Sequence, residues 1–232
     1  MSRCCGSEVA LCTELRRKFA PSEQIHIFYF TVIFSSQKSN TMNMNGKEAI
    51  METKNHLQLA LDIASEKKLG KYSKYFVLGS IMPDINLFTY LRGHTYKESI
   101  KFIERKTKEL TEKSVWNRKS YYDLGIILHY LADYFTFPHN TNFRGNLAEH
   151  RKYEKKLRHR FSSFLKSRRK QQWQDSITTN TVKQMFHYLD IAHQEYIATT
   201  PSVETDCNYI LFITNYVIET LNNLKTPQLV LE

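Results

Sequence analysis

The sequence contains few chain breakers and few cysteines. Glycine and proline account for only 12 of the 232 residues, 7 and 5 respectively, which is too few for the many turns of a β-sandwich or barrel. Three of the four cysteines (Cys4, Cys5 and Cys12) lie near the start, so Cys207 stands alone in the rest of the chain and no disulfide framework can hold the core. Because 41% of the residues are hydrophobic and 24% charged, the chain can bury its own core. These features exclude intrinsic disorder and a fibrous protein, and they predict an all-α fold.

Long hydrophobic runs are also missing. The longest one outside an amphipathic pattern covers residues 25–34, about half of what a membrane span requires. It follows Arg16-Arg17-Lys18, which is the order of charge and apolar stretch in a signal peptide, but no small-x-small cleavage site follows before Gln37. We therefore expect a cytoplasmic or peripheral membrane protein rather than an exported one.

Positive charge, by contrast, is abundant. The 33 lysines and arginines exceed the 23 aspartates and glutamates, giving a net charge of +10, which favours an anionic partner such as phosphate, an acidic lipid surface or nucleic acid. Residues 151–170 are strongly basic. This segment is either a solvated surface or a docking face for anionic lipid or a nucleic-acid backbone. A nuclease would also need aromatic platforms for unstacked bases, and the aromatic residues here are mostly at helix-core spacing, so nucleic acid is the less favoured partner.

The character of the chain changes near residue 50. Residues 35–46 are polar and rich in breakers, as in a linker, so we expect an N-terminal extension over 1–50 and a helical domain over 51–232. Since Met42, Met44 and Met51 precede the first strong helix pattern, two starts stay open: Met1, with residues 1–50 as an unstructured extension, or an internal methionine, with residues 1–50 outside the working protein. Hydrophobic spacing predicts helices over about 54–68, 72 to the turn at Pro83, 96–113, 118–137, 146–167, 180–198 and 203–224. The 118–137 helix is apolar on all sides and is expected to be buried at the centre.

Ionisable residues on that central helix need a buried partner. His129 and Asp133 are four residues apart and project from one face. A hydrogen bond between them, or a divalent cation bound by both, would offset the cost of burying the carboxylate. His139 follows at the end of the same helix, and His150 and Glu154 repeat the spacing on the next one.

Three more candidate ligands lie upstream: His56 in the first helix, Asp84 at the end of the second and His94 in the loop after it. Together the eight residues offer oxygen and nitrogen atoms without a thiolate. Such a set suits zinc, or another borderline divalent cation, in a catalytic site with open positions.

The spacing resembles that of the zinc-dependent phospholipases C, distant relatives of the trinuclear-zinc P1 and S1 single-strand nucleases. The matching pattern, over about residues 54–165, is His129-x3-Asp133-x5-His139 followed by His150-x3-Glu154, with Asp84 and His94 upstream. The stretch from His129 to Asn140 is particularly similar to a short bacterial subgroup. The resemblance implies a single multi-helix domain with a metal cluster between central helices. It also implies hydrolysis of a phosphodiester, with phospholipid the favoured substrate. A single-strand nuclease and a metal-binding module without turnover are the alternatives.

Carried over by position, the resemblance implies two zinc ions. The first would be held by Asp84, His94, His129 and Asp133, and the second by His139, His150 and Glu154. Asp133 would also bridge to a third ion bound by His56. In the family that third ion is completed by an amino-terminal tryptophan, whereas the only tryptophans here are Trp116 and Trp173, so the third site stays open.

The resemblance also bears on catalysis and on the substrate. It implies that Asp84 either orients or deprotonates the attacking water, or serves only as a ligand. In the members that cleave phosphatidylcholine, one aromatic residue follows the counterpart of Asp84, and another lies three residues before that of His94. Here those positions are Ile85 and Leu91, so no choline preference is expected.

Overall fold

The structure is a computed structural model that describes residues 45–85, 93–168 and 179–224. Contacts divide the chain into two units, Met1–Lys47 and Glu48–Glu232, and the account below concerns the second. The apolar run at 25–34 lies outside the described residues, and the domain boundary near residue 50 stays a prediction. Among the described helices, none is both long and apolar enough to cross a membrane.

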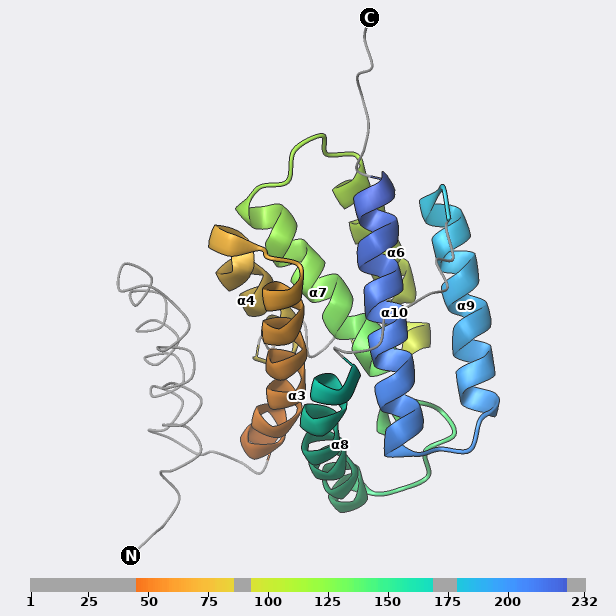
Figure 1. Cartoon of the computed structure of the whole chain (residues 1–232). Coiled ribbons are helices and arrows are strands. Elements are labelled where there is room, and N and C mark those ends of the chain that lie inside the picture. Colours follow the sequence, from red (N-terminus) through yellow and green to blue (C-terminus); the bar gives the residue numbers. More distant parts are fainter. Residues whose placement is uncertain (1–44, 86–92, 169–178, 225–232) are drawn as a thin grey trace, which may run out of the picture. The chain divides into compact units, whose positions relative to one another are not determined.

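The described part of the chain is helical and contains no strand, which confirms the all-α prediction. Its elements are α3 (Asn45–Glu66), η2 (Gly70–Tyr72), α4 (Ser73–Ile85), α6 (Tyr96–Thr111), α7 (Arg118–Tyr134), η3 (Phe137–His139), α8 (Leu147–Arg168), α9 (Val182–Ala198) and α10 (Val203–Leu224). Helix α7 contacts α4, α6 and α10 (Figure 1). Every residue of α7 from Asp123 to Tyr134 is buried, as predicted for the central helix.

The end of α7 and the start of α3 differ from the prediction. Helix α7 stops at Tyr134, and His139 lies on the separate 3-10 turn η3, because the backbone is extended at Thr136 and Pro138 has no N–H to donate. The Asn140 side chain donates to the carbonyls of Tyr134 and Thr136, which satisfies groups that the helix end leaves open. Helix α3 begins at Asn45, nine residues before the predicted start, so the last residues of the predicted linker are helical.

Helix α4 continues through Pro83 to Ile85, where the sequence predicted a stop. Proline removes only the hydrogen bond that its own nitrogen would make to the carbonyl of Gly79. Since Pro83 lies in the last turn, the helix keeps its other bonds and extends far enough to include Asp84. The Asp84 side chain is therefore held by a buried helical turn rather than by the predicted turn.

Helices α4 and α7 touch backbone to backbone at two glycines. A Cβ atom on Gly79 would lie 2.0 Å from the carbonyl oxygen of Tyr122, and one on Gly125 would lie 2.2 Å from that of Phe76. Neither space admits a methyl group. Tyr75 contacts Arg118 near the start of α7, so the two helices run in the same direction and both end near the predicted metal ligands.

We expect Gly125→Ala to destabilise the fold by about 2 kcal/mol or more, since the added methyl collides with backbone that cannot rotate away. At an ordinary helical position the same change stabilises by about 0.5–1 kcal/mol. Urea unfolding at equilibrium distinguishes a tight contact from an ordinary helical position, because the change in the free energy of unfolding has opposite signs in the two cases. Unchanged or increased stability would contradict the contact between α4 and α7.

Candidate metal centre

All eight predicted ligands lie around the C-terminal half of α7. They come from six places in the chain: His56 from α3, Asp84 from α4, His94 from the loop before α6, His129 and Asp133 from α7, His139 from η3, and His150 and Glu154 from α8. Three groups, each with ligand atoms within 4.8 Å of one another, can be drawn from them: His56, His129 and Asp133; Asp84, His94 and His129; His139, His150 and Glu154. Packing of the helices thus brings candidate ligands that are far apart in the sequence into one cluster.

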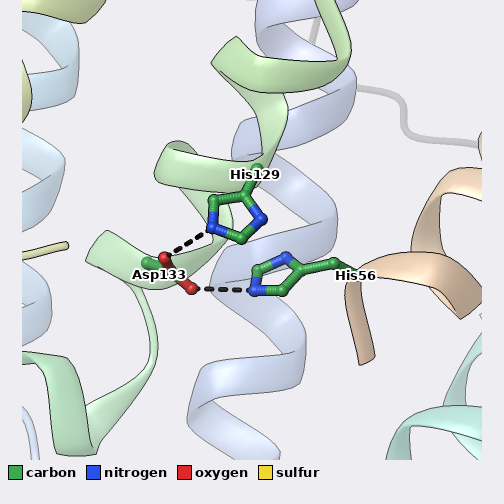
Figure 2. A group of neighbouring side chains, drawn as sticks. All are labelled: His56, His129 and Asp133. Atoms are coloured by element: carbon green, nitrogen blue, oxygen red, sulfur yellow. Dashed lines mark ion pairs between the residues drawn. The ribbon is translucent and has the colours of Figure 1, made fainter. Parts of the chain in front are cut away.

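Asp133 is the centre of the cluster. Its Oδ1 atom lies 2.9 Å from Nε2 of His56, and its Oδ2 atom lies 2.9 Å from Nδ1 of His94 and 3.2 Å from Nε2 of His129. Figure 2 shows the rings of His56 and His129 pointing at this carboxylate from α3 and α7. His139 approaches Oδ1 at 4.0 Å. One buried carboxylate therefore faces four imidazoles.

The electrostatics of the cluster keep Asp133 ionised. Burial alone would raise its pKa, but the surrounding His129, His139 and His56 more than offset this and hold the pKa well below the usual range. At His94, burial acts to lower the pKa, while the hydrogen bond to Asp133 and the charges of Asp133 and Asp84 raise it by more, so its pKa is raised overall. The carboxylates therefore supply the negative charge that a bound cation needs.

A hydrogen bond to the backbone of α4 fixes the orientation of the His129 ring. Its Nδ1 atom lies 2.9 Å from the carbonyl oxygen of Ser80, and because a carbonyl only accepts, this nitrogen donates. In the neutral ring Nε2 then carries a lone pair. That atom faces Oδ1 of Asp84 at 3.4 Å and Oδ2 of Asp133. Three acceptors converging on one space are stabilised by a cation, and the bond to Ser80 is the outer-shell contact typical of a metal-bound histidine. The residues present therefore fit a divalent cation.

The third group, His139, His150 and Glu154, approaches Oδ1 of Asp133 through His139. Glu154 is buried, and its Oε1 atom lies 3.7 Å from Nε2 of His139. The rings of His139 and His150 meet edge to face, with centroids 5.1 Å apart. His150 and Glu154 share one face of the first turns of α8, as their spacing predicted.

Asn55 belongs to the site, although it is not among the eight predicted ligands. It is buried beside His56, and its amide donates to Oε2 of Glu154, while its Oδ1 atom has no hydrogen-bond partner among the described residues. Asn55, His56, Asp133 and Glu154 line a cavity of about 20 Å³, enough for one water or ion. A signal was present, since a polar residue next to a candidate ligand on a mostly apolar helix face needs an explanation.

A second layer of buried polar contacts holds η3 and α8 in place. Oδ2 of Asp206 accepts hydrogen bonds from the backbone N–H of Phe137 and the hydroxyl of Tyr153, and Oδ1 accepts from Tyr196. Burial raises the pKa of Asp206 to about 6, although these hydrogen bonds act to lower it. Phe137 and Tyr153 lie next to the segments that carry His139 and Glu154. Asp206 therefore anchors both halves of the third group without belonging to it.

The ligand sets inferred from the resemblance and the groups found here overlap but are not identical. His139, His150 and Glu154 form one group in both, whereas Asp133 is grouped with His56 and His129 and approaches the others as a shared neighbour. Trp116 packs against Tyr121 and belongs to none of the groups; Trp173 and Leu91 lie outside the described residues. Which residues bind each ion stays a prediction.

Removing the charge at Asp133 should release metal. In Asp133→Asn the four imidazoles lose their shared anion, so we expect zinc per chain, measured by elemental mass spectrometry, to fall below half of the wild-type value. Asp190→Asn is the matched control, because Asp190 accepts hydrogen bonds from Tyr96 and Gln194 outside the cluster and the amide oxygen can still accept the one from Tyr96. Wild-type zinc content in Asp133→Asn would show that Asp133 is not a ligand.

His193 should make stability depend on pH. Its Nε2 atom lies 2.9 Å from Oδ1 of Asn140, and burial lowers its pKa from 6.5 to about 4. Between these values the unfolded chain binds a proton that the folded chain excludes. The contribution of neutral His193 to the free energy of unfolding is therefore complete above pH 6.5. It is lost as the pH falls toward 4, which amounts to about 3 kcal/mol.

The test compares urea unfolding of the wild type and His193→Gln from pH 4 to pH 7, with metal removed. We expect the difference in unfolding free energy between the two proteins to shrink as the pH falls. His187→Gln, at an exposed position on the same helix, controls for the loss of an imidazole. A difference that stays constant with pH would contradict a buried, neutral His193.

Comparison with known proteins agrees with this geometry. A family described as zinc dependent phospholipase C matches residues 51–203. No curated protein and no solved structure matches the chain. The matched segment covers more than half of the chain and includes all eight candidate ligands. The chain belongs to the zinc-dependent phospholipase C family.

Proposed function

We propose that the protein is a zinc-dependent phosphodiesterase that hydrolyses a phospholipid between the phosphate and the lipid alcohol. The observation that carries this proposal is the buried cluster of five histidines and three carboxylates centred on Asp133. Membership of the family supports zinc as the metal and phospholipid as the substrate class. The donor set agrees with zinc, since imidazole and carboxylate ligands with open positions are typical of catalytic rather than structural zinc sites.

We assign the ligands to ions as follows. One ion is held by Asp84, His94, His129 and Asp133, and a second by His139, His150 and Glu154, with His56 and Asp133 available to a third. When bound, zinc supplies a Lewis acid that lowers the pKa of water and neutralises charge on the phosphoryl oxygens. The chain contributes the fixed positions of these ligands and a largely buried site.

Asp84 is assigned the proton transfer. Its Oδ1 atom faces His129 at 3.4 Å, and Oδ2 is the oxygen that we assign to the attacking water. The water oxygen bonds to phosphorus while Oδ2 takes its proton. The bond from phosphorus to the alcohol oxygen then breaks, and the proton passes from Asp84 to the departing alcohol. The products are a phosphomonoester and an alcohol.

The activity is tested on the zinc-loaded full chain with phosphatidylglycerol, phosphatidylcholine and a single-stranded oligonucleotide. We expect release of phosphomonoester from the lipids. In Asp84→Asn we expect kcat to fall by about 10²–10⁴, with zinc retained because the amide oxygen can still bind the ion but cannot take the proton. Asp190→Asn again serves as the control.

Other outcomes separate the alternatives. Loss of zinc in Asp84→Asn would leave Asp84 as a ligand only. Cleavage of the oligonucleotide without lipid hydrolysis would indicate a nuclease of the P1 type. Full zinc content with neither reaction would indicate a metal-binding module without turnover.

A further inference from the structure

A basic cleft lies at the opposite end of α7 from the candidate metal centre. It has a volume of about 560 Å³, and its lining includes Lys71, Tyr72, Lys74, Tyr75, Arg118 and Lys119, with no acidic residue among the described residues that line it. Arg118 begins α7, so at about 1.5 Å per residue His129 lies about 16 Å farther along the helix axis. The cleft is therefore separate from the eight candidate ligands.

The cations of the cleft are arranged around its tyrosines. Lys74 Nζ and the Arg118 guanidinium lie 5.3 and 5.7 Å from the centre of the Tyr75 ring. Lys71 Nζ lies 5.2 Å from the centre of the Tyr72 ring. Such contacts stabilise each cation by cation–π attraction, but they also bring like charges together around one opening. An anion bound between them would relieve that repulsion.

The acidic partner of Lys119 is shared with two other lysines. Lys119 reaches Asp123 at 2.6 Å, but the same carboxylate is also approached by Lys106 at 2.7 Å and by Lys113 at 3.9 Å. One carboxylate shared by three lysines leaves positive charge in excess beside the cleft. Because α4 and α7 both begin here and run in the same direction, the positive ends of two helix dipoles add to it.

The aromatic contacts favour a phosphate over a nucleic-acid base. Binding of single strands depends on bases stacking on open aromatic faces. The ring of Tyr72 already stacks on Tyr121, with centroids 4.5 Å apart and planes 8° apart, and Tyr75 is engaged by two cations. What the cleft offers is ammonium and guanidinium groups, of which Lys71 and Arg118 are exposed. Exposed cations flanked by tyrosines suit the phosphate layer of a membrane surface.

We infer that this cleft binds the phosphate of an anionic lipid headgroup and docks the protein on anionic membranes. The inference does not depend on catalysis, since it concerns a surface away from the metal centre. It differs from the expectation for the basic segment at 151–170, whose described part lies on α8 with exposed Lys155 and Lys156 but does not line the cleft.

The test compares three charge-reversal pairs in the full chain: Lys71→Glu with Arg118→Glu in the cleft, Lys155→Glu with Lys156→Glu on α8, and Lys101→Glu with Lys108→Glu on the exposed side of α6. Each pair changes the net charge of +10 by the same amount. Binding is measured by sedimentation with phosphatidylcholine vesicles, with and without phosphatidylglycerol, in short incubations in the cold. A single-stranded oligonucleotide is the second probe.

We expect the cleft pair to lower the partition onto vesicles with phosphatidylglycerol at least tenfold, and each other pair to lower it less than threefold. Equal losses in all three pairs would show a general charge effect and overturn the inference. A larger loss in the α8 pair would place the docking surface there instead. Loss of oligonucleotide binding with vesicle binding intact would overturn the assignment to lipid. If the cleft pair unfolds, Lys71→Gln with Arg118→Gln removes the same charges with less strain, and its expected loss is at least threefold.

Discussion

The backbone contact between α4 and α7 determines how His129 and Asp84 meet at the centre of the site. Because neither Gly79 nor Gly125 carries a side chain, the two helices approach until the carbonyl of Ser80 reaches Nδ1 of His129, one turn beyond Gly125. Asp84 lies one turn beyond Ser80 and meets the same imidazole from its other nitrogen. A larger residue at either glycine would separate the helices, and both contacts of His129 would lengthen together. The orientation of this ligand therefore depends on residues that cannot themselves bind a metal.

The parallel course of these helices also separates charge. Both begin at the basic cleft, where Tyr75 contacts Arg118, and both end at the candidate metal centre, where Asp84 contacts His129. Helix dipoles favour anions near the first turn and cations near the last. The same pair of helices thus supports anion binding at one end and cation binding at the other, in agreement with lysines and arginine at the first and carboxylates at the second.

Local pattern accounts for what the sequence predicted correctly. Spacing of four residues places His129 with Asp133, and His150 with Glu154, on one face of a helix whatever the rest of the chain does. The apolar character of α7 on all sides likewise required burial. One missed feature depends on a contact between distant segments, because Asn55 acquires its role only when α8 brings Glu154 beside it. The break before His139 is local, since it depends on Pro138 and on how Asn140 caps the end of α7, and the spacing of apolar residues does not reveal it. The number of zinc ions and the substrate follow neither from local spacing nor from these contacts.

The third ligand group depends on a different set of contacts. His139 and Glu154 come from η3 and α8, which the glycine contact does not hold. Their positions depend on Asp206, which joins Phe137 and Tyr153, and on the bond between Asn140 and His193. These contacts extend from α9 and α10, so the last two helices serve the metal centre although none of the eight ligands lies on them. Substitutions in α9 or α10 that leave the fold intact can therefore displace His139, His150 and Glu154 while the contacts of His129 with α4 stay in place.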